Sequence, residues 1–221
     1  MSEKPKIELE DAFSSKTPQD NIRLYEDWAE TYESDFVAAK GYVYHERVVE
    51  QMRDHMASIH GAILDVGCGT GIVGIALQQA GFDTIDGVDI SPAMLAESRK
   101  KTTPDGQPVY RKLIEADLTS QVDLPDGSYA GIISSGTFTH GHLGPETMDQ
   151  LWRLAEPGAR CVVGINSRHY DLMGFGEKIA IDASSGVIST PELIEVAIYD
   201  SDDDQSAHSS DTALIVDCTV F

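Results

Sequence analysis

The chain has 221 residues, of which 41% are hydrophobic, enough for one domain with a packed core and marginal for two. Acidic residues outnumber basic ones 37 to 16, and the net charge of −21 argues against binding DNA, RNA or an anionic membrane. Three isolated cysteines, a polar N-terminal stretch and the lack of any apolar run near the roughly 20 residues that span a bilayer predict a reduced, cytoplasmic location. No Cys/His spacing predicts a metal site.

The first predicted element is a helix that begins after Thr17. Thr17 is a favourable N-cap, Pro18 suits the first turn, and Asp20 lies three residues beyond the cap. Tyr25 and Tyr32 are seven residues apart, so this helix has an aromatic face. Such a face is ordinarily a packing surface, and it is also a candidate contact for a ligand.

Residues 17–60 are predicted to form a helical cap with a second helix over 44–59, and residues 1–16 a tail or flexible lid. The core at 61–221 alternates short apolar runs with helical stretches of about ten residues. The predicted strands lie within 62–67, 84–91, 109–118, 129–136, 160–166, 192–200 and 211–221, and the intervening helices within 71–81, 92–101 and 145–158.

This alternation predicts an α/β fold, a single doubly wound, mainly parallel, seven-stranded sheet with helices on both faces. The last two strand-like runs are joined by an acidic, Ser-rich connector with no helix between them. We therefore expect an antiparallel hairpin that closes one edge of the sheet.

The glycine-rich turn after the first predicted strand has two interpretations. From Gly69, the letters GTGIVG fit the dinucleotide fingerprint G-x-G-x-x-G, and Asp89 lies 20 residues further on, near the distance expected for an acid that holds ribose. From Asp65, the letters DVGCGTG place an acid before Gly67, Gly69 and Gly71. An unpaired acid inside a strand would be costly, whereas one facing the pocket at the strand's end would meet a cationic amino group.

The second interpretation resembles motif I of the class I S-adenosylmethionine-dependent methyltransferases. Later stretches resemble the motifs that follow it in the family, at 87–95, 115–118, 124–136 and 156–163. The chain departs from the family where Ala130 follows Tyr129, a position that often holds an acid, and it lacks the Asn-Pro-Pro-Tyr signature of many amino-group methyltransferases. The family's sheet also ends in an antiparallel hairpin.

The resemblance implies S-adenosylmethionine as cofactor, S-adenosylhomocysteine as product and no metal. It implies that Asp65 and the three glycines hold the cofactor, that Asp89 binds the ribose diol and that Asp117 accepts from the adenine amine. Apolar residues beside these acids would flank the adenine or belong to the core. The further predicted cofactor contacts are Ile90, Met94, Leu118, Ser134, Tyr25 and Tyr32.

The stretch 136–144 follows the fourth predicted strand, beside the expected position of the methyl group. His140 is a candidate general base, because imidazole exchanges protons near neutral pH. Thr137, His142 and Arg168 are candidate substrate contacts, the arginine for a carboxylate. Structural histidines and an ordinary surface arginine are the alternatives.

The sequence favours methyl transfer to an O, N or S nucleophile of a small metabolite, because no recognition domain is appended to the predicted core. One alternative is a protein methyltransferase or a cofactor-binding regulatory subunit. A less favoured one is an NAD-dependent oxidoreductase, which would leave Asp65 without a ligand. The expected partner is a small-molecule acceptor, with no nucleic acid and no membrane.

Overall fold

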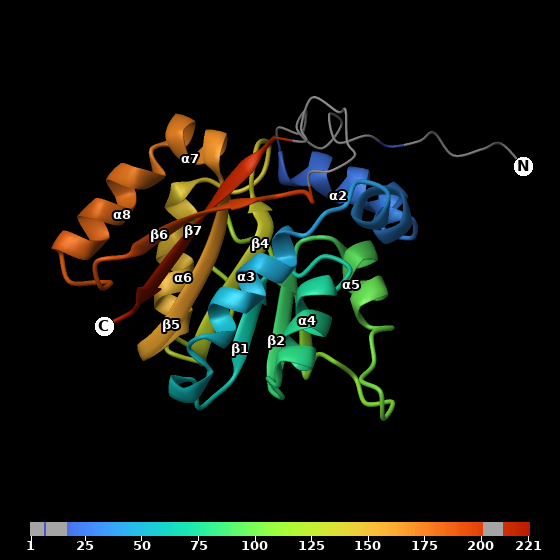
Figure 1. Cartoon of the computed structure of the whole chain (residues 1–221), viewed down its shortest axis with the longest axis horizontal. Helices are drawn as coiled ribbons and strands as arrows, with labels where there is room; N and C mark the ends of the chain where they lie inside the picture. The colour runs from blue at the N-terminus through green and yellow to red at the C-terminus, as the bar shows by residue number, and fades with distance from the viewer. Residues whose placement is uncertain (1–6, 8–16, 201–209) are drawn as a thin grey trace, which may run out of the picture.

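The computed structural model of the chain describes residue 7, residues 17–200 and residues 210–221. Its strands form one seven-stranded sheet (Figure 1). They are β1 (Ile63–Val66), β2 (Ile85–Asp89), β3 (Lys112–Glu115), β4 (Tyr129–Phe138), β5 (Ala155–Asn166), β6 (Glu192–Ala197) and β7 (Thr212–Thr219).

The strand order is β3-β2-β1-β4-β5-β7-β6. The first five strands pair in parallel, and β7 pairs antiparallel with both β5 and β6. The predicted, mainly parallel sheet with a C-terminal antiparallel hairpin is confirmed. The chain reverses its winding direction between β1 and β4, and ligands bind beyond the carboxyl ends of strands at such a point.

Helices surround the sheet, as predicted. They are α2 (Pro18–Trp28), α3 (Tyr44–Arg53), α4 (Ile72–Ala80), α5 (Pro92–Ser98), α6 (Met148–Leu154), α7 (Ser167–Met173) and α8 (Phe175–Ser184), with a π-helical η1 (Glu33–Ala38) and short 3-10 turns η2 (Met56–Ser58) and η3 (Pro145–Thr147).

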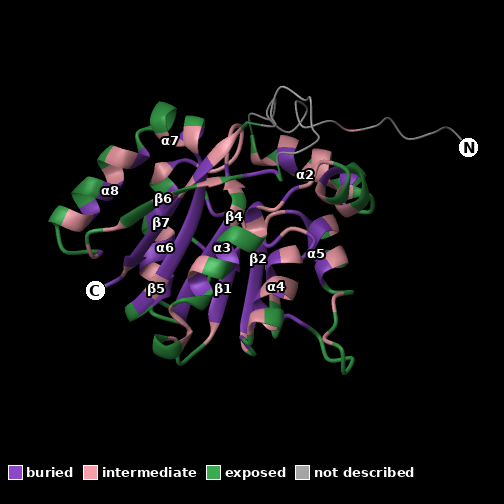
Figure 2. Ribbon diagram, in the orientation of Figure 1, coloured by how far each residue is buried: buried purple, intermediate pink, exposed green. Residues whose placement is uncertain are grey.

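Neighbouring strand residues enter two separate hydrophobic clusters, one on each face of the sheet. Ile63 packs with Leu77 of α4, whereas Leu64 packs with Leu151 of α6. This separation follows from the alternation of side chains along a strand. The inner strands β1, β2, β4, β5 and β7 are mostly buried, whereas the edge strands β3 and β6 are partly exposed (Figure 2).

The helix predicted over 44–59 ends at Arg53, and the 3-10 turn η2 follows separately. The helix predicted over 145–158 ends at Leu154, because Ala155 is extended and pairs with Tyr129 of β4. Pro157 disfavours helical backbone just before it, which explains the early end. The sequence did not predict α7 and α8, which lie between β5 and β6.

The predicted capping of α2 is confirmed. The Thr17 hydroxyl accepts from the Asp20 N–H at 3.2 Å, and the Asp20 carboxylate accepts from the Thr17 N–H at 3.1 Å. Helix α2 packs against α5 and lies beyond the end of the sheet at which the β4 arrow finishes (Figure 1). The cap therefore lies next to the loops that follow the parallel strands.

The predicted tail or lid at 1–16 lies outside the described residues, except for Ile7, which is partly buried against the first hydrophobic cluster. Within the described ranges, none of the helices combines the length and the apolar character that crossing a bilayer requires.

Candidate functional site

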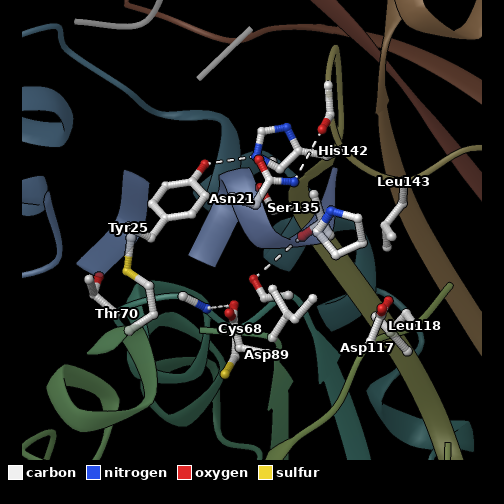
Figure 3. Close-up of a pocket in the computed structure, with 18 of the residues that line it drawn as sticks. Asn21, Tyr25, Cys68, Thr70, Asp89, Asp117, Leu118, Ser135, His142 and Leu143 are labelled. Carbon is white, nitrogen blue, oxygen red and sulfur yellow. Dashed lines mark hydrogen bonds between the residues drawn. The ribbon is translucent and has the colours of Figure 1, made fainter. Parts of the chain in front are cut away.

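A cavity of about 250 Å³ lies between the cap and the carboxyl ends of β1, β2 and β4 (Figure 3). The cap contributes polar and aromatic side chains, and the glycine-rich turn contributes backbone. Its lining includes Asn21, Tyr25, Tyr32, Tyr42, Gly67, Cys68, Gly69, Thr70, Asp89, Ile90, Met94, Asp117, Leu118, Ser135, Gly136, Thr137, His142 and Leu143.

The glycine-rich turn forms a cradle that only glycine can build. Gly67 has φ +68°, and a Cβ at this position would lie 2.6 Å from Cγ2 of Thr137. Gly71 has φ +92° and precedes the first residue of α4 without lining the cavity. A left-handed backbone without side chains lets a ligand approach the main chain closely.

Asp65 does not line the cavity, contrary to the prediction. Its side chain is fully buried in β1, and the Tyr110 hydroxyl donates to its Oδ2 at 2.7 Å. Burial raises the pKa of Asp65 to about 7, while the bond from Tyr110 opposes the rise. The same hydroxyl accepts from the Gly74 N–H at 3.1 Å, so Asp65 and Tyr110 support the turn from beneath.

Tyr110 also explains the apparent dinucleotide fingerprint. A Cβ on Gly74, the last glycine of the pattern, would overlap the Tyr110 ring. This glycine therefore makes room for a buried tyrosine. Its presence carries no information about a dinucleotide ligand.

The two acids at the ends of β2 and β3 do face the cavity. Asp89 accepts from the Gly69 N–H at 2.9 Å and from the Ser91 N–H at 2.8 Å, and burial raises its pKa. Asp117 accepts from the Thr119 N–H at 2.8 Å. Asp89 ends β2 and Asp117 follows β3 (Figure 3), so the cavity receives one carboxylate from each of two neighbouring strand ends.

The apolar residues predicted beside these acids, Ile90, Met94 and Leu118, also line the cavity. Ser134 does not, because it is fully buried in β4 and its hydroxyl donates to the Val66 carbonyl at 2.8 Å. Its neighbour Ser135 lines the cavity in its place, as expected from the alternation of side chains along a strand.

The side chains of Tyr25 and His142 point toward one another in the wall of the cavity (Figure 3). The Tyr25 hydroxyl lies 3.0 Å from Nε2 of His142, and Nδ1 of His142 lies 2.9 Å from the His140 carbonyl oxygen. Burial lowers the pKa of His142, which favours the neutral ring. A carbonyl can only accept, so Nδ1 carries the proton, and Nε2 accepts from Tyr25.

His140 and Arg168 are not brought to the cavity, contrary to the predictions. Gly141 has φ +77°, and this reversal turns His142 inward, while the His140 ring lies 5.5 Å from that of His169. Arg168 is exposed at the start of α7. Thr137 does line the cavity, as predicted.

Several lining residues were missed by the sequence reasoning. Asn21 donates to the Gly141 carbonyl at 3.1 Å and so ties α2 to the loop after β4. Its Oδ1, and Oγ1 of Thr70, are buried without a hydrogen-bond partner within the described ranges. Asn21 shares a helix face with Tyr25, and that spacing could have identified it. Buried polar atoms of this kind call for a polar ligand.

A second cavity, of about 60 Å³, adjoins the first beneath the cap. The two cavities share the three tyrosines Tyr25, Tyr32 and Tyr42, together with Gly136 and His142. Because these residues line both spaces, they mark the junction at which two bound molecules would meet.

Comparison with known proteins finds a family match within the core. Residues 63–158 match the model of a family described as a methyltransferase domain. This match supports the resemblance of the core to the class I S-adenosylmethionine-dependent methyltransferases. Human methyltransferase-like protein 27 is 29% identical over 140 residues, which is 62% of this chain and 54% of that protein. The carboxy-S-adenosyl-L-methionine synthase of Methylococcus capsulatus is 34% identical over 117 residues, 51% of this chain and 46% of that protein.

Among solved structures, the methyltransferase in complex with the Trm112 activator of Haloferax volcanii has a TM-score of 0.61 and 17% identity to this chain. The match covers 89% of this chain and 98% of the other. At this identity the likeness concerns the fold. The sequence match spans about half the length of the curated relatives.

The residues that line the first cavity fit S-adenosylmethionine. The Gly67 cradle admits the main-chain approach that the cofactor needs, and the partnerless Thr70 hydroxyl lies on the same turn. Asp89 and Asp117 supply carboxylates at two points, and Met94 supplies apolar surface. No group of three or more His, Cys, Asp or Glu that could hold a metal is found among residues 7, 17–200 and 210–221.

Proposed function

We propose that this protein transfers the methyl group of S-adenosylmethionine to an O, N or S nucleophile of a small metabolite. Asp89 would bind the ribose hydroxyls, Asp117 the adenine amine, and the turn from Gly67 to Thr70 the methionine end. Their arrangement along one cavity supports this assignment. The predicted role of Asp65 becomes indirect, since Asp65 supports the turn without facing the cavity.

The observation that carries the proposal is the Tyr25–His142 pair at the junction of the two cavities. S-adenosylmethionine supplies a methyl group that its sulfonium already activates. The residues of the chain have to align the nucleophile, exclude water and accept a proton. The cap residues cover the junction, and the Tyr25–His142 pair can accept a proton there.

Proton transfer would run through Tyr25 to His142. Burial raises the pKa of Tyr25 and lowers that of His142, so the pair rests as a neutral phenol and a neutral imidazole. When a nucleophile gives its proton to the Tyr25 oxygen, Tyr25 passes its own to Nε2 of His142. This path needs no phenolate, which burial disfavours.

Replacing His142 by asparagine tests this assignment. We expect kcat to fall about a hundredfold, the usual contribution of a positioned base, with the affinity for S-adenosylhomocysteine little changed. The His140→Asn variant is the matched control, because His140 lies two residues away and outside the cavity lining. Equal effects of the two substitutions on kcat would contradict the assignment.

The pH profile supplies a second readout for the same base. Because burial lowers the pKa of His142 below its ordinary value of 6.5, the neutral base is lost only as the pH falls below that value. We therefore expect kcat to decline as the pH falls below 6.5. This decline should disappear in the His142→Asn variant. The side chains that face the ring are Tyr25 and, more distantly, His169.

A partner-dependent function is the second candidate, since the solved Haloferax volcanii neighbour is a complex with a methyltransferase activator. Methylation of small metabolites by this chain alone would count against it. The match of residues 63–158 to a methyltransferase domain disfavours an NAD-dependent oxidoreductase.

A further inference from the structure

We propose that the methyl acceptor is a small alkylammonium compound whose cationic nitrogen occupies the second cavity. The inference rests on the proposed function and names its substrate class. The second cavity is small, about 60 Å³, and its wall is mainly aromatic. Its phenylalanine, tyrosine and tryptophan side chains are Tyr25, Trp28, Tyr32, Phe36, Tyr42, Tyr44, Phe138 and Tyr199.

Two of the ring pairs in this wall meet at steep angles. Trp28 and Tyr32 meet at 76° with their centroids 5.1 Å apart, and Tyr42 and Tyr44 meet at 83° with centroids 6.2 Å apart. A cation within about 6 Å of several ring centroids is attracted by each of them, and more strongly where water is excluded. A compact ammonium head suits both the size and the wall of this cavity.

The charges around the two cavities favour a cation. No lysine or arginine from the described part of the chain lines either cavity. Asp89 and Asp117 line the first cavity, and Asp211 lines the second. A carboxylate or phosphate on the acceptor would be buried here without a counter-charge, at considerable cost. The exposed Arg168 cannot supply that charge.

Two buried polar atoms at the second cavity also point to a ligand. Nε1 of Trp28 and the hydroxyl of Tyr44 have no hydrogen-bond partner within the residues that the structure describes. Their side chains are only 3% and 2% exposed. The Trp28 N–H can donate to a neutral oxygen. We therefore expect the acceptor to carry a hydroxyl or carbonyl oxygen beside its amine.

The reaction balances with this acceptor. The ammonium first loses one proton to the Tyr25–His142 pair, which leaves a neutral amine with a free electron pair. That pair forms the new N–C bond as the methyl C–S bond breaks, and the electrons of the C–S bond stay on sulfur. The products are a methylated ammonium and S-adenosylhomocysteine. Positive charge moves from sulfur to nitrogen beside aromatic rings, which stabilise it.

Binding of choline tests the inference, because choline carries a quaternary nitrogen and a hydroxyl and cannot itself accept a methyl group on nitrogen. The comparison compound is the neutral alcohol in which carbon replaces the choline nitrogen. The chain has two tryptophans, and Trp152 lies elsewhere, where its Nε1 donates to Asp182 at 2.8 Å. A Trp152→Phe background therefore lets fluorescence report on Trp28 in the second cavity.

With S-adenosylhomocysteine present, we expect choline to bind roughly tenfold more tightly than its neutral analogue. Equal binding of the two compounds would overturn the inference.

In a second experiment, turnover with S-adenosylmethionine is measured on small hydroxyalkyl amines, the matched diols and carboxylic acids, and a tetralysine peptide. We expect N-methylated small amines by mass spectrometry.

The outcomes separate the two proposals. Methylation of diols or acids but not of amines would overturn the ammonium acceptor and leave small-metabolite methyl transfer standing. Methylation of the peptide alone would place the ammonium on a protein and overturn the small acceptor. If S-adenosylhomocysteine fails to bind and no acceptor is methylated, the proposed function itself is wrong.

Discussion

Replacing Gly67 by alanine is expected to lower the affinity for S-adenosylhomocysteine by about a hundredfold. The new Cβ would lie 2.6 Å from Cγ2 of Thr137, and the φ of +68° disfavours any side chain. Relief of the overlap has to move either the turn or Thr137, and both line the cofactor cavity. Calorimetric titration of each variant measures the change.

Gly106→Ala is the matched control for this substitution. Gly106 also has a left-handed backbone, with φ +83°, yet a Cβ there would meet nothing within 4 Å. We expect this variant to lose about 1 kcal/mol of folding stability and to bind S-adenosylhomocysteine normally. If the two variants lost affinity equally, backbone strain would explain the effect and the cradle would not.

Asp89→Asn is expected to weaken S-adenosylhomocysteine binding by a similar factor, about a hundredfold. The carboxylate accepts from the Gly69 N–H and the Ser91 N–H through different oxygens. An asparagine side chain has a single acceptor oxygen, so one amide would face an NH₂ group. The variant therefore loses the proposed ribose contact and also loosens the turn.

Asp83→Asn controls for the loss of one negative charge, because Asp83 is exposed just before β2. We expect its binding to match that of the unsubstituted chain. Thermal unfolding without ligand shows whether Asp89→Asn is folded. A folded Asp89→Asn variant with unchanged affinity would contradict the proposed role of Asp89.

Most of the fold could be predicted because its signals are local. Apolar runs separated by helical stretches predicted the parallel sheet, and the two final runs predicted the hairpin that β6 and β7 form. Helices α7 and α8 escaped prediction because they leave Leu172, Met173 and Ile181 exposed. Their sequences consequently lack a clean apolar stripe.

The direction in which a side chain faces could be predicted where chain position alone decides it. Asp89 and Asp117 follow strands and face the cavity as expected. Asp65 does not, because Tyr110, 45 residues away in the sequence, covers it. His142, predicted as a substrate contact, lines the cavity and His140 does not, with the left-handed Gly141 between them. Contacts and backbone turns of this kind depend on the folded structure, so the motif alone cannot supply them.

Calorimetric titration of the unsubstituted chain with S-adenosylhomocysteine and, separately, with NAD⁺ is the most direct test of the cofactor. The two ligands correspond to the two interpretations of the glycine-rich turn. We expect saturable binding of S-adenosylhomocysteine at one site and no binding of NAD⁺. Binding of NAD⁺ without binding of S-adenosylhomocysteine would contradict the assignment of this cavity.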